Sequence, residues 1–445
     1  MDSRIVVIGA GMAGTRLARQ LSASSPSSSP SFDVTLLGEE PHDPYNRVLL
    51  AEVLAGRYGP EVVALPPVPV RRGVRAVSID RAARVVHCAD GAEAFELPYD
   101  RLVLATGSNP VLPPLRGIGG GRLPDGVHPF RTLDDCLALA AAALPGTRAV
   151  VVGGGLLGVS AARALAERGA DVVLAHQGPH LMDRHLDAAS GELVRRHVEA
   201  LGVEVHTECH ARGLRADGAR VCGVELADGF VLDAETVVLA CGVRPRTGLA
   251  AEAGLEVRQG IVVDDELRTS DPYIHAIGDC AEHGGRVYGL ATPALEQADA
   301  LAGILAGDGQ STRTGVTHPP ARTGGSMPAP EASGPAPRTE PPRYTGTRAL
   351  TRLTLSGPVP DHAPFDLATF GEPTPRPGDD VVQLTDATRG AYRKVVVRGD
   401  RLVGGVLLGD LARVGTLARA WEADEPLPDH DDAPLLHLLT TDGGL

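Results

Sequence analysis

The chain has 445 residues, of which 43% are hydrophobic, and a formal net charge of −14 at pH 7. This length allows two or three domains with cores of their own, and the negative charge argues against a nucleic-acid partner, because phosphate binding requires basic surfaces. No apolar run approaches the roughly 20 residues that cross a bilayer, and no signal peptide precedes Ile5, so we expect a cytoplasmic protein without membrane contact.

The first element is a strand, Ile5–Ile8, that runs into the turn Gly9-Ala10-Gly11-Met12-Ala13-Gly14 and then into an Ala/Leu/Arg-rich helical stretch. In this G-x-G-x-x-G pattern the first glycine makes the turn, the second lets the backbone approach a pyrophosphate, and the third lets the helix pack on the strand. We expect the pyrophosphate at the helix N-terminus, where unpaired N–H groups and the positive dipole end meet it.

A Ser/Pro-rich tract, Ser22–Ser31, interrupts this unit and is interpreted as an exposed loop. The second strand, Asp33–Leu37, ends close to Glu39 and Glu40. An acid near this point usually holds the ribose of the dinucleotide, so Glu39 is the first candidate and Glu40 the second. Either one is also compatible with a solvated loop acid. A further buried strand within Tyr99–Ser108 ends in a turn of small residues.

A second glycine turn, Gly153-Gly154-Gly155-Leu156-Leu157-Gly158, follows the strand Ala149–Val152. Two such motifs predict two dinucleotides in one chain, most economically FAD and a nicotinamide nucleotide. The next strand, Asp171–Ala175, is followed by His176 and Gln177 with no carboxylate at the ribose position. The choice between NADH and NADPH therefore stays open.

After residue 243 the chain is expected to return to the first domain, with a strand at Tyr273–Ile277 and a helix from about Pro293 to Leu305. The Pro/Gly/Ser-rich composition that follows predicts a disordered linker. Beyond it we expect strands at Ala349–Leu355, Tyr392–Val397 and Leu402–Leu408, and a short helix around Leu417–Glu422. The turn Arg398–Arg401 is expected to join the last two strands as a hairpin.

The predicted fold class is α/β, with two Rossmann-like dinucleotide-binding domains and a small, mostly-β C-terminal domain. The FAD-binding domain is discontinuous. The predicted boundaries are 1–115 and 244–306 for the FAD-binding domain, 116–243 for the NAD(P)H-binding domain, 307–343 for the linker and 344–430 for the C-terminal α+β domain.

The six cysteines are scattered, and no C-x-x-C occurs, which argues against a redox dithiol or a four-cysteine cluster. The nearest approach to a metal motif, His206–His210, is interpreted as polar residues at a strand edge. We therefore predict no metal site.

Several segments together carry a resemblance to a known family: Glu39–Gly56, Gly153–Gly158, Leu186–Ala189, Ala276–His283 and Gly285–Leu290. With them the chain resembles the FAD/NAD(P)-dependent pyridine nucleotide-disulfide oxidoreductase class, which implies the glutathione-reductase-like arrangement of the two dinucleotide-binding domains. Within that class it is most similar to the FAD- and NAD(P)H-binding part of assimilatory nitrite reductase large subunits.

The resemblance implies two sets of cofactor-binding residues and no catalytic side chain, because the flavin itself carries the hydride chemistry. The FAD set is Gly9, Gly11, Met12, Ala13, Gly14, Glu39, Glu40, Arg47, Ala105, Thr106, Gly107, Gly278, Asp279, Thr292 and Pro293. The NAD(P)H set is Gly153, Gly155, Leu156, Leu157, Gly158, His176 and Gly242. Asp279 is implied to bind the ribityl chain, and Leu290–Ala294 to open a helix beneath the flavin.

Three departures from the family pattern stand out. Ser160 replaces a Glu that many relatives have near the nicotinamide, and Glu52 replaces the Lys of related ferredoxin reductases, so an ion pair near the flavin is expected to be missing. Full nitrite reductase large subunits continue into Cys-rich iron–sulfur and sirohaem regions. The 445 residues hold none of those cysteines, so we do not expect them to reduce nitrite by themselves.

The resulting hypothesis is an FAD-dependent NAD(P)H oxidoreductase that passes electrons to a separate iron–sulfur or haem protein, in nitrate or nitrite assimilation. One alternative is a ferredoxin or rubredoxin reductase unconnected to nitrogen. Another is a non-catalytic flavin-binding interaction module, and a third is a chain whose second nucleotide site stays empty. A monomer or a homodimer is expected.

Overall fold

The computed structural model describes residues 3–23, 32–119, 123–311, 343–355, 365–386, 388, 390–409, 411, 413–427 and 439. The chain forms two compact units, which are described one at a time. The first comprises 1–44, 65–107 and 245–346, and the second 45–64, 108–244 and 347–445. Most of the predicted Ser/Pro loop and of the predicted linker lies outside the described residues. The assignment of domains to particular cofactors stays a prediction.

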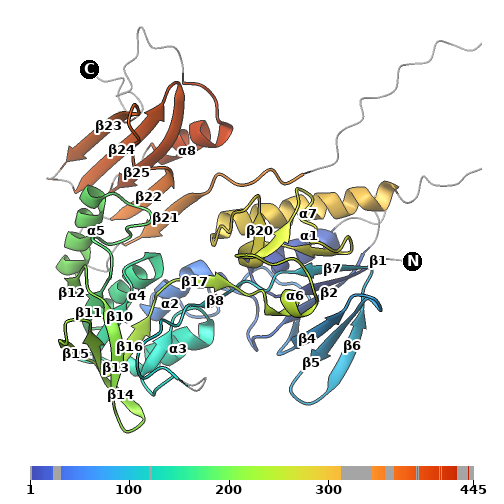
Figure 1. Ribbon diagram of the computed structural model, residues 1–445, viewed down its shortest axis with the longest axis horizontal. Coiled ribbons are helices and arrows are strands. Elements are labelled where there is room, and N and C mark those ends of the chain that lie inside the picture. Colours follow the sequence, from blue (N-terminus) through green and yellow to red (C-terminus); the bar gives the residue numbers. More distant parts are fainter. Residues whose placement is uncertain are drawn as a thin grey trace, which may run out of the picture. The chain divides into compact units, whose positions relative to one another are not determined.

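The first unit is built on a parallel sheet in the order β19-β7-β1-β2-β3. The strands are β1 (Ser3–Ile8), β2 (Phe32–Gly38), β3 (Arg71–Arg72), β7 (Arg101–Leu104) and β19 (Ile274–Ala276). The aliphatic side chains of the three strands β1, β7 and β19 are almost fully buried, as expected for strands that are covered on both faces. Helices α1 (Met12–Ala23) and α7 (Ala291–Ser311) pack against each other, where the Arg16 guanidinium pairs with Asp299 (Figure 1).

A smaller antiparallel sheet in the same unit was not predicted. It consists of β4 (Arg75–Asp80), β5 (Val85–Ala89) and β6 (Ala94–Pro98). The unit also contains the pair β18 (Ile261–Val263) and β20 (Ala281–His283), the short helix α6 (Gly248–Glu252) and the 3-10 turn η2 (Gly278–Cys280). The predicted strand at Tyr273–Ile277 and the predicted helix after Leu290 are confirmed, although the helix runs further, to Ser311.

His275 lies fully buried in strand β19, and this burial, with Arg101 and Arg268 nearby, lowers its pKa to about 3. The unfolded chain takes up the proton near pH 6.5, so stability falls between about pH 6.5 and pH 3, where the unfolded state alone binds it. The free energy of unfolding falls between pH 7 and pH 5, and we expect this fall to be about 2 kcal/mol smaller in His275→Leu than in the parent chain. Urea unfolding at both pH values measures this, and equal losses in the variant and the parent chain would contradict it.

The second unit is also built on a parallel sheet, in the order β12-β11-β10-β16-β9. The strands are β9 (Val127–Pro129), β10 (Arg148–Val152), β11 (Asp171–Ala175), β12 (Val203–His206) and β16 (Thr236–Leu239). The helices are α2 (Leu50–Leu54), α3 (Leu133–Ala142), α4 (Leu156–Glu167) and α5 (Ala188–Ala200). A three-stranded sheet of β13 (Ala211–Asp217), β14 (Arg220–Leu226) and β15 (Val231–Asp233) and the pair β8 (Ser108–Pro110) and β17 (Val243–Pro245) complete it.

The C-terminal part of the second unit is an antiparallel sheet in the order β21-β22-β25-β24-β23, accompanied by helix α8 (Val414–Ala423). Its strands are β21 (Leu350–Thr354), β22 (Asp366–Gly371), β23 (Asp380–Asp386), β24 (Ala391–Arg398) and β25 (Arg401–Leu408). The three predicted strands, the hairpin between β24 and β25 and the final helix are confirmed, and β22 and β23 are additional.

This C-terminal sheet shares a core with helix α5. Asp187 caps the helix and accepts hydrogen bonds from Lys394 Nζ at 2.6 Å and Tyr392 Oη at 2.8 Å. Burial alone would raise the pKa of Asp187, but the bonds from Lys394, Ser190 and Tyr392 outweigh it and hold the pKa at about 2. Further along the helix, the His197 ring stacks on Phe365 at 4.4 Å between centroids. Helix α5 thus packs on the sheet through apolar side chains and through the largely buried ion pair of Asp187 with Lys394.

None of the helices within the described ranges is both long and apolar enough to cross a membrane.

Candidate functional site

The first glycine turn connects β1 to α1 in the first unit. A Cβ atom on Gly9 would collide with the carbonyl oxygen of Ala105, and one on Gly14 with the carbonyl oxygen of Gly9. A Cβ on Gly11, by contrast, would meet no atom within 4 Å. Two glycines are therefore required by the close packing of strand, turn and helix. Gly11 instead leaves open space beside the first turn of α1, where an anionic ligand would meet the backbone N–H groups.

The predicted ribose acid Glu39 stands directly after β2, at the same carboxyl edge of the sheet. Its carboxylate accepts a hydrogen bond from Arg246 Nη1 at 2.6 Å, and Arg75 Nε lies 3.9 Å away. Arg246 is held in turn by the turn after β7: its N–H donates to the Gly107 carbonyl at 2.9 Å, and its carbonyl accepts from Thr106 Oγ1 at 2.7 Å. Arg246, which sequence analysis missed, thus contacts three of the predicted residues: Glu39, Thr106 and Gly107.

Asp279 lies in the turn η2, after β19 and two strands from β1. The N–H of the preceding Gly278 donates to Oε1 of Gln297 at 2.7 Å, and the Gln297 side chain is almost fully buried in α7. Thr292 and Pro293 stand in the first turn of that helix. Gln297 therefore ties the Asp279 turn to the helix predicted to lie beneath the flavin, and no motif in the sequence identified it.

The second glycine turn connects β10 to α4 and repeats the pattern of the first. A Cβ on Gly153 would collide with the Ala240 carbonyl oxygen, and one on Gly158 with the Gly153 carbonyl oxygen. Gly155, the N-cap of α4, has no atom within 4 Å of such a Cβ. Gly242 follows β16, at the same edge of the sheet. The second unit therefore repeats the arrangement of the first, a glycine turn with one open glycine position beside a helix N-terminus, which we call a glycine cradle. This is the geometry that a dinucleotide diphosphate requires.

His176 stands directly after β11, where its side chain is buried against the second glycine turn. Its Nδ1 accepts the N–H of Gly154 at 3.1 Å, and Oδ1 of Asp183 lies 3.5 Å from its Nε2. Burial lowers the pKa of His176 despite the opposing effect of Asp183, so the ring is neutral and Nδ1 remains an acceptor near pH 7. His176 thus supports the glycine turn, and Asp183, which sequence analysis did not single out, brings a carboxylate to this edge.

His176→Leu is expected to weaken NAD(P)H binding about tenfold, because it leaves the buried N–H of Gly154 without its acceptor. His176→Asn is the matched control, since an amide oxygen can occupy the position of Nδ1. Steady-state KM for NADH and NADPH measures the effect, with FAD content as the check on folding. Equal KM values in the Leu and Asn variants would show that the hydrogen bond is unimportant.

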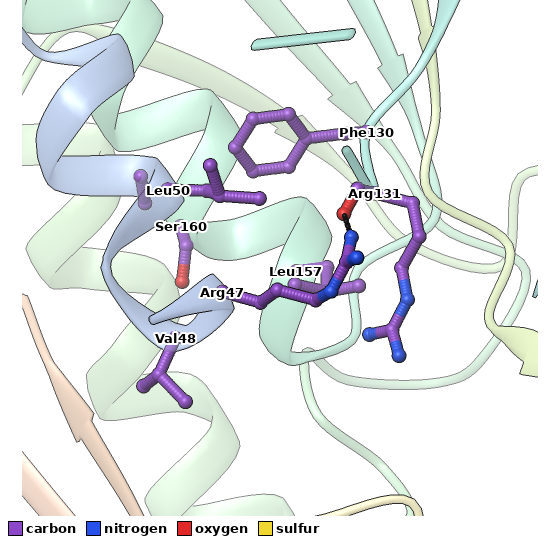
Figure 2. Close-up of a pocket in the computed structure, with 8 residues that line it drawn as sticks. Arg47, Val48, Leu50, Phe130, Arg131, Leu157 and Ser160 are labelled. Carbon is purple, nitrogen blue, oxygen red and sulfur yellow. Dashed lines mark hydrogen bonds between the residues drawn. The ribbon is translucent and has the colours of Figure 1, made fainter. Parts of the chain in front are cut away.

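A pocket in the second unit lies beside the N-terminal part of α4. It is lined by Arg47, Val48, Leu50, Ala51, Phe130, Arg131, Leu157 and Ser160 (Figure 2). Arg47 Nη1 donates to the Arg131 carbonyl at 3.1 Å and to Tyr45 Oη at 2.9 Å. The pocket thus brings together Arg47, predicted to contact FAD, and Leu157, predicted to contact NAD(P)H. Arg131, which supplies a second cation, was missed.

The two departures from the family pattern have definite places in this unit. Ser160 Oγ donates to the Leu156 carbonyl at 2.8 Å, within the first turns of α4. Glu52 is ion-paired with the fully buried Arg163 and, at 3.1 Å, with Arg57. Glu167 accepts from the same two arginines at 3.0 and 2.7 Å. Glu52 is thus ion-paired within the second unit, where Arg163 balances its charge. The expectation that an ion pair near the flavin is missing stays a prediction.

The residues present fit the two cofactors that the sequence predicts, since each cradle has an open glycine position beside a helix N-terminus. The six cysteines are free thiols, and burial raises the pKa of Cys241 to about 11. Among the described residues, no group of three or more His, Cys, Asp or Glu side chains is placed to hold a metal ion.

Fold and cradles together define a two-dinucleotide oxidoreductase. Residues 3–298 match the family described as pyridine nucleotide-disulphide oxidoreductase, and residues 363–424 match the rubredoxin NAD+ reductase C-terminal domain. The chain belongs to the pyridine nucleotide-disulphide oxidoreductase family. The predicted class, fold and cofactors, FAD and NAD(P)H, are thereby confirmed.

Individual proteins are similar over most of the chain. A nitrite reductase [NAD(P)H] from Bacillus subtilis is 32% identical over 99% of this chain and 50% of its own length. An assimilatory nitrate reductase electron transfer subunit from the same organism is 31% identical over 92% and 48%. The chain thus spans about half the length of these relatives. A crystal structure of a ferredoxin reductase from Rhodopseudomonas palustris superimposes with a TM-score of 0.76, at 25% identity, and covers 96% of both chains.

Proposed function

We propose that the protein takes hydride from NAD(P)H onto FAD and passes the electrons to a separate redox protein of the iron–sulfur or haem type. The observation that carries this proposal is the pair of glycine cradles, each with its open position at a helix N-terminus. The absence of C-x-x-C from the sequence supports a protein acceptor rather than an internal dithiol. FAD, when bound, supplies two-electron acceptance and one-electron release.

The residues of the chain bind and orient in this proposal, and none of them acts as nucleophile or general base. The N-terminal N–H groups of α1 and α4 meet the two diphosphates. Glu39 binds the adenosine ribose of FAD, and Asp279, tied by Gln297, binds the ribityl chain. The N-terminus of α7 at Ala291 places a positive dipole end beside Thr292 and Pro293, and it would favour negative charge on a flavin bound there.

We propose that the electrons serve nitrate or nitrite assimilation. Similarity to the nitrite reductase and to the nitrate reductase electron transfer subunit of Bacillus subtilis over more than nine tenths of the chain supports this role. A ferredoxin or rubredoxin reductase is the second candidate, supported by the C-terminal domain match and by the ferredoxin reductase fold. A monomer or homodimer in the cytoplasm stays a prediction.

Anaerobic stopped-flow mixing tests the proposal. The FAD-loaded full chain is expected to lose its flavin absorbance on addition of NADH or NADPH with saturable kinetics. The reduced protein is then mixed with a ferredoxin, a rubredoxin and the sirohaem-containing part of a nitrite reductase. Reoxidation by the last of these supports the assimilatory role, and reoxidation by the small carriers alone favours the second candidate. A flavin that stays oxidised with both nucleotides would refute the proposal and favour a non-catalytic module.

A further inference from the structure

Arg246 forms an ion pair with Glu39 that is too exposed to add much stability but lies at the edge of the sheet where FAD is proposed to bind. The side chains of Arg246 and Glu39 are 45% and 50% exposed, and ion pairs at such exposure add about 0–1 kcal/mol to stability. The two residues lie 207 positions apart in the sequence. The backbone of Arg246 is nevertheless held by two hydrogen bonds to the Thr106–Gly107 turn. These bonds fix the point from which the side chain extends.

The order of the strands shows what lies between the two ends of this side chain. Arg246 is attached to the turn after β7, and its guanidinium reaches Glu39 after β2, whereas β1 lies between these two strands. Neighbouring strands are about 4.8 Å apart, so the side chain extends across about two strand spacings. The turn that follows β1 begins at Gly9, whose N–H donates to the Leu37 carbonyl at the end of β2. Arg246 therefore spans the edge that carries the first glycine cradle.

We propose that Arg246 is an FAD-positioning residue that holds Glu39 toward the adenosine ribose and balances negative charge beside the diphosphate. This inference rests on the proposed binding of FAD in the first unit. Two adjacent acids, Glu39 and Glu40, stand at an edge that is to receive a diphosphate, and their repulsion would weaken binding. The guanidinium neutralises Glu39 while its carboxylate keeps the position that ribose hydroxyls require.

Titration of FAD into the deflavinated full chain, followed by flavin fluorescence, tests this role. Arg246→Gln is expected to raise the Kd for FAD about tenfold at low salt, and the difference from the parent chain is expected to shrink at high salt, where the charge is screened. Arg246→Lys keeps the charge and is expected to recover most of the affinity. Arg244→Gln is the matched control, because Arg244 is an exposed arginine two positions earlier, at the centre of β17.

The outcomes separate this inference from the function on which it rests. If the parent chain binds FAD and Arg246→Gln binds it with the same Kd and the same salt dependence, the role of Arg246 is refuted. A loss of affinity that Arg246→Lys does not recover and that salt does not change would also refute a charge-based role. If the parent chain binds no FAD at all, the proposed function itself fails.

Discussion

Replacing Gly155 with valine is expected to slow reduction of the flavin by NAD(P)H roughly 100-fold at limiting nucleotide, while FAD stays bound. Gly155 has an extended backbone, with φ −79° and ψ −173°, that any residue adopts. No atom lies within 4 Å of an added Cβ, so a side chain can begin at this position without a clash. The new side chain fills the space beside the N-terminus of α4 where the diphosphate would meet the backbone. A loss of about 3 kcal/mol of binding energy corresponds to a fall of roughly 100-fold in the reduction rate at limiting nucleotide.

Gly11→Val is the matched variant in the first cradle, since a Cβ there also meets no atom within 4 Å. It is expected to remove FAD from the purified protein, whereas Gly155→Val keeps its full flavin content. Stopped-flow reduction measures the nucleotide step, and reduction of the Gly155→Val flavin by dithionite shows that the flavin itself remains competent. Reduction of that variant by NAD(P)H at the parent rate would show that the nucleotide does not use the second cradle.

The sequence was sufficient to predict the elements in which local pattern and tertiary role agree. The β-branched runs before each glycine turn became the central strands β1 and β10, and the hairpin around Gly399 was predicted because a turn separates two apolar runs. Strand β22 was missed because its short sequence, Asp366–Gly371, is neither alternating nor rich in β-branched residues. Its extended form is stabilised by pairing with β21 on one side and β25 on the other.

The site was predictable where backbone geometry dictates the residue and unpredictable where distant side chains meet. Glycines at positions 9, 14, 153 and 158 are required by contacts that any side chain would violate, so the motif identifies them. Arg246 and Gln297 acquire their roles only through folding, because each contacts a turn far away in the sequence. His176 was predicted from its position after a strand, but its role as the acceptor of the Gly154 N–H depends on a contact that only folding creates.

Arg163 is expected to have the largest effect on stability of any single side chain in the second unit's charge cluster. The cluster consists of Glu52, Arg57, Arg163 and Glu167, and it is electrically balanced. Arg163 is fully buried, and Glu167 is nearly so. Arg163→Met leaves two carboxylates with one arginine in a largely dry environment, and breaking a buried pair in this way costs about 3–5 kcal/mol. Urea unfolding is expected to show a lower midpoint concentration, and a free energy of unfolding reduced by that amount.

The double variant Glu52→Met/Arg163→Met restores the balance of charge, because Arg57 and Glu167 remain paired at 2.7 Å. It is expected to recover about half or more of the lost free energy, since apolar side chains of similar volume replace a buried ion pair at little cost. Arg148→Met serves as the control: Arg148 is 54% exposed in its pair with Asp233, so a change within about 1 kcal/mol is expected. A double variant no more stable than Arg163→Met would contradict this explanation. It would mean that the single variant loses stability through poorer packing and not through the unpaired charge of Glu52.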